Sequence, residues 1–162
     1  MKYLSLFFVC VIFAVSCDKG LEPPPPVTPN TNITLTGTVH FTGNWPPQDS
    51  ARITAVFLVE AAPPFTVSQV IIGLLANTVQ WDTLHYKTPD TTYLFFNPPP
   101  GTYHYLCVGQ QDGDTATTDW RAVGFAHDLS GKPITFNLQS GDSIVQNLYV
   151  NFDSLPAQPF IQ

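Results

Sequence analysis

Charged side chains are scarce in this sequence, and basic ones are the scarcest. Only 11% of the residues are charged, and 6 lysines and arginines face 12 aspartates and glutamates, for a formal net charge of −6. An acidic chain repels phosphate backbones and gains nothing from an anionic membrane surface, so we expect no nucleic-acid partner. Because 44% of the residues are hydrophobic, the composition predicts a folded domain instead of a disordered chain.

Motifs of catalysis and cofactor binding are missing as well. The chain has no Gly-x-Ser-x-Gly nucleophile elbow, no phosphate-binding loop and no dinucleotide-binding fingerprint. Its histidines lack the paired spacing of zinc ligands and are scattered at His40, His85, His104 and His127. We therefore expect a protein that is not an enzyme.

The main apolar run lies at the N-terminus and is too short to cross a membrane. Residues 4–15 are almost all apolar, whereas a membrane-spanning helix needs about 20 residues. With Lys2 before it, the run is typical of a signal peptide. It ends in Ala-Val-Ser-Cys at positions 14–17, which resembles the bacterial lipobox. The resemblance implies a signal peptide over 1–16 and lipid attachment to Cys17.

Proline is concentrated directly after this cysteine. Pro23 to Pro26 and Pro29 fall in a stretch that joins no apolar pattern, and we interpret 17–32 as a lipidated cysteine followed by an extended linker. Such a linker would hold a domain away from the membrane that the lipid anchors. We expect a place in the bacterial cell envelope, and the sequence leaves open which membrane and which face.

Cysteine usage agrees with this interpretation. Cys10 would leave with the signal peptide and Cys17 would carry lipid, so Cys107 would remain alone and without a disulfide. We expect Cys107 to be a small buried hydrophobe. His104, three positions earlier on the same predicted strand, would lie on the opposite face and could not activate it.

The remaining chain alternates between apolar and polar residues in short segments. In 33–41, Ile33, Leu35, Val39 and Phe41 fall on one face and threonines and His40 on the other, which predicts a half-buried strand. Further strands are expected at 52–59, 79–87, 91–97, 102–109, 120–126, 133–139 and 144–152. The segment 52–59 is apolar on both faces and should be a central strand covered by a loop. The spacing in 67–76 fits a short helix, but Gly73 and β-branched residues make it ambiguous.

These segments predict an all-β fold. About seven or eight strands, separated by turn signals, are typical of an antiparallel β-sandwich. We place this domain at 33–153 and expect the C-terminal tail, 154–162, to fray.

Two segments carry a family resemblance. They are Gly-Thr-Val-His-Phe at 37–41 and Asn-Pro-Pro-Pro-Gly-Thr-Tyr-His-Tyr at 97–105. The second resembles the Pro-Pro-Gly-Thr-Tyr turn and strand of carboxypeptidase-regulatory-like and related transthyretin-like domains. With the lipobox and linker, the chain is similar to small lipoproteins of Bacteroidota-type bacteria. The resemblance implies a prealbumin- or immunoglobulin-like sandwich without an active site, in which Gly101 makes the turn and Tyr103 enters the core; the apolar insertion at 61–78 departs from the family.

Two groups of residues are candidates for ligand binding. Asp112, Asp114 and Asp119 cluster in one loop, where their oxygens would suit Ca²⁺, although the spacing is not that of an EF-hand and Asp-Gly is also a common turn. Trp45 and Trp120 border loops and could offer flat faces to a sugar, or could fill the core as tryptophan commonly does.

The sequence thus favours a non-catalytic, lipid-anchored module of the cell envelope, with a structural role or a partner protein. The alternative is a carbohydrate-binding lipoprotein that uses Trp45, Trp120 and the acidic loop. No cofactor is expected apart from the Ca²⁺ that this loop would bind.

Overall fold

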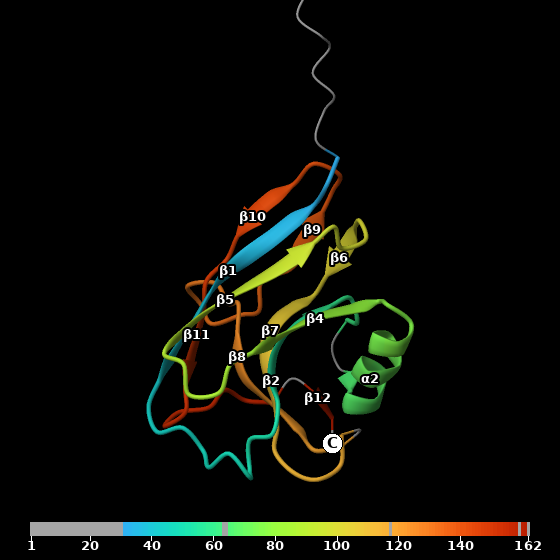
Figure 1. Ribbon diagram of the computed structural model, residues 1–162. Coiled ribbons are helices and arrows are strands. Elements are labelled where there is room, and N and C mark those ends of the chain that lie inside the picture. Colours follow the sequence, from blue (N-terminus) through green and yellow to red (C-terminus); the bar gives the residue numbers. More distant parts are fainter. Residues whose placement is uncertain (1–30, 63–64, 117, 159, 162) are drawn as a thin grey trace, which may run out of the picture.

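Two β-sheets packed face to face make up the body of the protein (Figure 1). The computed structural model describes residues 31–62, 65–116, 118–158 and 160–161. The predicted signal peptide, Cys17 and most of the proline-rich linker lie outside the described residues. Within them, no helix has the length and apolar character needed to cross a membrane.

The first sheet is built on the opening strand. β1 (Thr34–Thr42) pairs on one edge with antiparallel β5 (Asp90–Phe96). On its other edge it pairs with two short parallel strands in succession, β10 (Ser143–Val145) and β11 (Leu148–Asn151). The predicted strand at 144–152 is therefore interrupted. The sheet is mixed, not purely antiparallel, because the first and last strands of the sandwich run in the same direction.

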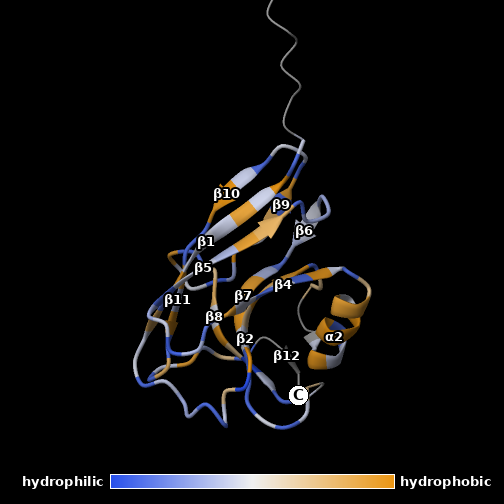
Figure 2. Cartoon of the chain, in the orientation of Figure 1, coloured by the Kyte–Doolittle hydropathy of each residue, from blue (hydrophilic) through white to orange (hydrophobic). Residues whose placement is uncertain are grey.

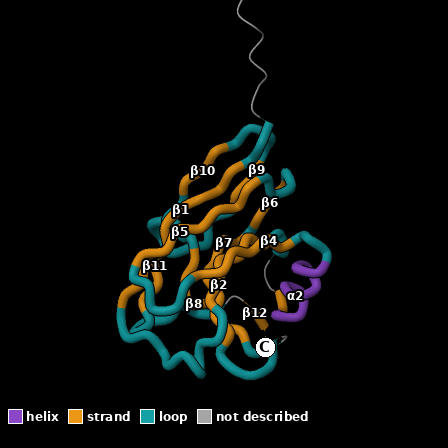
Figure 3. Tube along the Cα trace, viewed as in Figure 1, coloured by secondary structure: helices purple, strands orange, loops and turns teal. Residues whose placement is uncertain are grey.

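The second sheet is antiparallel throughout. Its order is β4 (Val79–Leu84), β2 (Thr54–Val59), β7 (Tyr105–Gln111) and β8 (Trp120–Phe125). All six residues of β2 are buried, as expected of a central strand. The cover on its outer side is a helix and not the predicted loop: α2 (Val67–Leu75) packs beside β4 (Figure 3).

Two small pairs of strands complete the fold. β6 (Gly101–Tyr103) pairs with β9 (Phe136–Leu138), and β3 (Phe65–Thr66) pairs with β12 (Phe160–Ile161). The predicted strand at 102–109 is split at His104, whose backbone N–H bonds to the Val59 carbonyl. All-β architecture and a sandwich of two sheets are confirmed.

The main core fills the space between the sheets. The alternation predicted for the opening strand is confirmed, since Leu35, Val39 and Phe41 are buried and the threonines between them are partly exposed. The two sheets meet at both sides of the sandwich: β4 lies beside β5 on one side, and β8 lies beside β11 on the other. The fully buried members of this core with large side chains are Ile33, Leu35, Leu58, Tyr93, Tyr103, Leu106, Leu138 and Leu148.

One open alternative is resolved, and two local predictions need correction. Residues 67–75 form a helix in spite of Gly73, because Thr66 and Gln69 make a reciprocal capping box at its start. The tail is docked and not frayed, since Gln158 bonds to Ala122 and β12 pairs with β3. The positive φ of the 97–101 turn belongs to Asn97, with φ 55°, and not to Gly101.

Candidate functional site

A second apolar cluster lies outside the sandwich core, between α2 and the outer face of the second sheet. Phe57, Val59, Tyr105 and Cys107 rise from β2 and β7, and Val70 and Leu74 of the helix pack on them. Figure 2 shows α2 coloured as hydrophobic along most of its length. The helix fits its strand closely because Gly73, its one buried residue, faces Val79: a Cβ there would lie 2.6 Å from the valine side chain.

Packing between helix and sheet is incomplete and leaves a partly open pocket. Its cavity volume is about 40 Å³. Val67, Val70 and Ile71 of α2 form one side. The other sides come from the second sheet and include Phe57, Cys107 and Trp120. Nearly all of these side chains are apolar, so the pocket suits an apolar group.

Two residues set the shape of the pocket. Trp120 stands edge-on to Phe57, with ring centres 5.4 Å apart and planes at 90°. Its indole N–H donates to the Ala116 carbonyl at 2.7 Å, which fixes the ring. Gly109 leaves room for Phe57, because a Cβ there would lie 2.7 Å from that ring. The pocket is therefore a product of fixed side chains and not of loose ones.

Among the described residues that line the pocket, Arg121 is the only charged one. Its guanidinium group binds Asp112 at 2.9 Å and donates to Gln110 Oε1 at 2.7 Å, and Gln110 in turn donates to Thr54. The Arg121 Nε atom is buried and has no hydrogen-bond partner. A buried donor without a partner is uncommon and calls for an explanation.

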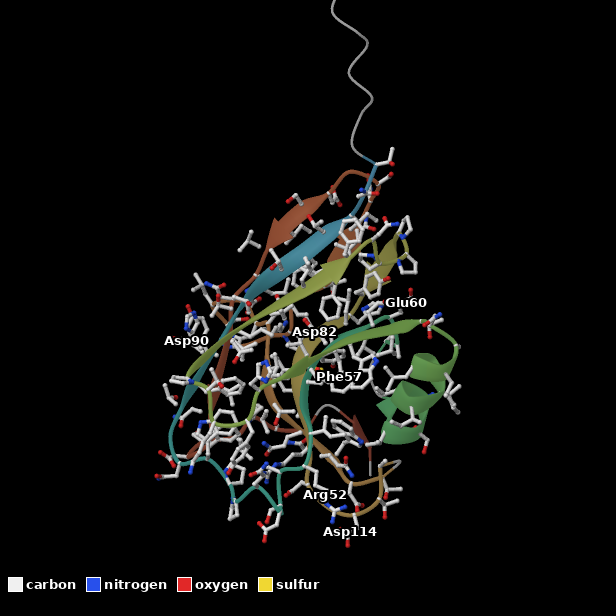
Figure 4. All side chains as sticks on the ribbon, in the orientation of Figure 1. Arg52, Phe57, Glu60, Asp82, Asp90 and Asp114 are labelled. Atoms are coloured by element: carbon white, nitrogen blue, oxygen red, sulfur yellow. The ribbon has the colours of Figure 1, made fainter. Side chains whose placement is uncertain are left out.

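The three aspartates predicted as calcium ligands each bind a different partner. Asp112 pairs with Arg121 and Asp114 with Arg52; Arg52 and Asp114 lie next to each other in Figure 4. Asp119 accepts bonds from the Thr115 N–H and the Thr118 hydroxyl, which hold the pKa of its carboxyl below the usual value. Among the residues described, no three acidic, histidine or cysteine side chains gather as a metal site would require. The geometry favours the turn interpretation of this loop.

The two candidate tryptophans do not share a surface. Trp45 packs in the main core, with ring centres 4.6 Å from both Phe41 and Phe152. Trp120 belongs to the outer cluster under α2, and both rings are half-buried. Trp81 on β4 is the exposed tryptophan. It is 51% accessible to solvent, and its ring stacks on the ring of Phe57. A flat platform made of Trp45 and Trp120 is therefore not present.

Cys107 behaves as the sequence predicted. It is buried and lines the pocket, and burial raises the pKa of its thiol to about 12. A thiol with so high a pKa is protonated at neutral pH and is a poor nucleophile.

The outer face of the first sheet carries several large apolar side chains in solvent. Leu94 and Phe96 of β5 are 54% and 63% exposed, and Val145 and Tyr149 on the opposite edge are 72% and 65% exposed. The register places Thr36 of β1 between Leu94 and Val145, so the apolar groups of the two edge strands flank one threonine on the same face of the sheet. We call Leu94, Phe96, Val145 and Tyr149 the exposed sheet face.

One end of this face is polar. His40 Nδ1 lies 2.7 Å from Asp90 Oδ1, and the His40 ring stacks on Tyr149 with centres 5.0 Å apart. Asp90, labelled in Figure 4, therefore orients the histidine, which in turn supports the tyrosine.

Neither the pocket nor the exposed sheet face was found by sequence reasoning. The helical spacing of Val67, Val70, Ile71 and Leu74 was a signal for the pocket, because an apolar helix next to a strand that is apolar on both faces implies that the two pack together. For the sheet face the signal was Leu94 and Phe96, large apolar residues at the positions of β5 opposite to Tyr93 and Phe95.

Comparisons with known protein families, with curated proteins and with solved structures found no significant match to this chain.

Proposed function

We propose that this protein is a non-catalytic, lipid-anchored module of the bacterial cell envelope that binds a partner protein through the exposed sheet face. The lipobox-like sequence ending at Cys17 and the proline-rich linker support the anchor. The exposed sheet face is the observation that supports a protein partner.

Exposed apolar groups seldom gather on one face without a binding role. Leu94, Phe96 and Val145 are exposed on the edge strands beside threonines of β1, and Tyr149 adds an amphipathic ring. Aromatic and aliphatic anchors with few charges are typical of the centres of protein interfaces. The acidic domain would select a partner whose facing surface is neutral or basic.

The family resemblance supports a binding role in place of catalysis. Tyr103 of the Pro-Pro-Gly-Thr-Tyr segment is fully buried and donates its hydroxyl hydrogen to the Pro99 carbonyl at 2.8 Å. A buried tyrosine at this position is what the resemblance to carboxypeptidase-regulatory-like domains implies, and it supports the proposal. We therefore propose that the chain is a distant relative of these accessory modules.

The anchor is tested by Cys17→Ala in a bacterium that expresses the full chain with radioactive palmitate. We expect the wild-type chain to be labelled and membrane-bound, and the variant to be unlabelled and unprocessed. Labelling of the variant at the wild-type level would contradict the anchor.

The binding face is tested by a photo-crosslinking amino acid placed at Val145, with the same residue at Leu129 as control. Leu129 is exposed as well but lies in the 127–131 turn, outside the strands of the first sheet. A discrete crosslinked product in the native envelope is expected from position 145 and not from 129, and it should disappear in Leu94→Asp. Equal products at both positions would argue against the face.

A further inference from the structure

The segment from Ala61 to Trp81 contains no charged residue. Its 21 positions hold no aspartate, glutamate, lysine, arginine or histidine, whereas 11% of the whole chain is charged. α2 lies within this segment and forms the right-hand side of the molecule in Figure 1, on the outside of the second sheet. Asp82, the next charged residue, is directed to β5, where it accepts the Leu94 N–H at 3.1 Å. The helix and the strand that follows it therefore offer an uncharged surface.

The outward side of α2 is also apolar. Ile72 and Leu75 are three positions apart and so lie on one side of the helix, where they are 63% and 86% exposed. Trp81 on β4, the strand beside the helix, is 51% exposed, and behind it lies the ring of Phe57 from the cluster under α2. The three exposed side chains thus belong to the same side of the sandwich. We call Ile72, Leu75 and Trp81 the α2 face.

Polar backbone groups at both ends of α2 find partners within the segment. At the start, the Thr66 hydroxyl accepts the Gln69 N–H, and the Gln69 side chain accepts the Thr66 N–H. At the end, the N–H and the hydroxyl of Thr78 both donate to the Gly73 carbonyl. Unpaired backbone groups are costly in contact with lipid, because no water is there to bond them. The caps therefore lower the cost of bringing this helix against a bilayer.

The linker is long enough for the α2 face to reach a membrane that holds Cys17. Fourteen residues, from Cys17 to Asn30, precede the part of the chain that the structure describes. At no more than about 3.5 Å per residue they span up to roughly 50 Å. β1, the longest strand, has 9 residues and measures about 30 Å. The linker therefore exceeds the longest strand of the domain and does not prevent membrane contact at the end where α2 lies.

We infer that the α2 face rests against the lipid bilayer that the anchor at Cys17 enters. The inference rests on the anchor of the proposed function and adds a second membrane contact to it. Ile72 and Leu75 enter the boundary between headgroups and acyl chains, where the amphipathic ring of Trp81 is also favoured. Three side chains are too few to hold a protein on a bilayer alone, but the anchor keeps them at a high local concentration beside it.

This contact orients the domain. α2 covers the outer side of the second sheet, and the exposed sheet face lies on the outer side of the first. With α2 against lipid, the exposed sheet face points away from the membrane, where a partner protein can reach it. A neutral lipid surface suits the contact better than an anionic one, because the chain carries a formal charge of −6.

The test uses the full chain, made with radioactive palmitate and reconstituted into phosphatidylcholine vesicles. The vesicles contain a phosphatidylcholine with a diazirine on its acyl chain, and mass spectrometry locates the lipid adducts after irradiation. We expect adducts on the α2 face and none on the exposed sheet face. A palmitate-labelled chain without adducts on the α2 face would overturn the inference and leave the anchor standing, whereas an unlabelled chain would contradict the anchor itself.

A matched pair of variants tests the two aliphatic side chains. Ile72→Gln/Leu75→Gln introduces a good helix former without charge and should reduce the adducts at Trp81 at least about tenfold. Leu129→Gln replaces an exposed leucine of the 127–131 turn and should leave them unchanged. Circular dichroism of both variants shows whether the fold is retained. An undiminished adduct yield at Trp81 in the folded double variant would contradict the contact.

A protein site on the α2 face is the competing outcome. With a photo-crosslinking amino acid at Leu75 of the full chain in its native envelope, we expect lipid adducts and no discrete protein product. A discrete crosslinked protein from this position, together with no lipid adduct at Leu75 in the vesicles, would overturn the inference in favour of a protein partner.

Discussion

The two segments that carry the family resemblance each contain a glycine, and the two differ in how much space a side chain would have. At Gly37 in β1, an added Cβ would lie 1.9 Å from the Gln146 carbonyl oxygen, an atom of the backbone where β10 gives way to β11. The same carbonyl accepts the Tyr93 hydroxyl at 2.6 Å, so it cannot move away without breaking that bond. At Gly101 the nearest atom to an added Cβ is a Glu60 carboxylate oxygen at 3.7 Å, an ordinary contact.

We therefore expect Gly37→Ala to lower the free energy of unfolding by about 3 kcal/mol or more, as overpacking against fixed backbone does. Gly101→Ala should change it by less than about 1 kcal/mol, because the site has room and no positive φ. Urea unfolding followed by tryptophan fluorescence measures both. Equal destabilisation by the two variants would contradict the close approach at Gly37.

Cys107 offers a second test at this scale. Since burial raises the pKa of its thiol to about 12, the thiol is protonated and shielded in the folded protein. In a chain with Cys10 and Cys17 replaced by alanine, a thiol reagent at pH 8 should not react until denaturant is added. Rapid reaction of the folded chain would show that the α2 pocket opens widely enough to admit the reagent.

Among the elements, strands were predicted well where one face is buried. The alternation of 33–41 specifies both the strand and its inward face, because polar threonines and apolar Leu35 and Val39 cannot exchange places without exposing the core. The local sequence does not predict where a strand is interrupted. His104 separates β6 from β7 although the alternation continues through it, since the break is imposed by a bond to the distant Val59 carbonyl.

The candidate sites were harder to predict for a related reason. Exposure of a tryptophan depends on partners far away in sequence: Trp45 meets Phe152, and Trp120 meets Phe57. The pocket needs α2, β2, β7 and β8 together. The helical spacing of 67–75 indicates only that this segment has an apolar face, and which strands it packs against is decided by tertiary contacts.

The docked tail gives a prediction at the scale of elements. Gln158 uses its side-chain amide to pair with both the N–H and the carbonyl of Ala122 on β8, at 2.8 and 3.1 Å, and so protects the edge of the second sheet. Gln158→Ala should lower the free energy of unfolding by about 1–2 kcal/mol through the loss of two hydrogen bonds.

The effect should also be local. Hydrogen exchange of the Ala122 amide should quicken in Gln158→Ala, while amides of β2 in the middle of the sheet keep their protection until global unfolding. As a control, Gln80→Ala removes a side-chain bond to the Asn77 carbonyl at the opposite edge and should leave Ala122 unaffected. Unchanged exchange at Ala122 in Gln158→Ala would mean that the tail does not hold this edge.

The stability of the whole molecule should depend on pH through the carboxyl groups of two loop residues, Asp119 and Asp128. Asp128 accepts bonds from Ser130 and from the Lys132 N–H, and Asp119 accepts them from Thr115 and Thr118. These donors favour the charged carboxylates and lower the pKa of both groups. A carboxyl whose pKa is lower in the folded state stabilises that state above its unfolded value, about 3.9, and the contribution disappears as pH falls through the folded value.

Melting temperatures of the wild type and of Asp119→Asn/Asp128→Asn, measured between pH 7 and pH 2, test this. The double variant should be less stable at pH 7, and the two curves should converge below pH 4 as the wild-type carboxylates become protonated. Curves for wild type and double variant that stay parallel down to pH 2 would show that these two carboxyl groups do not determine the loss of stability in acid.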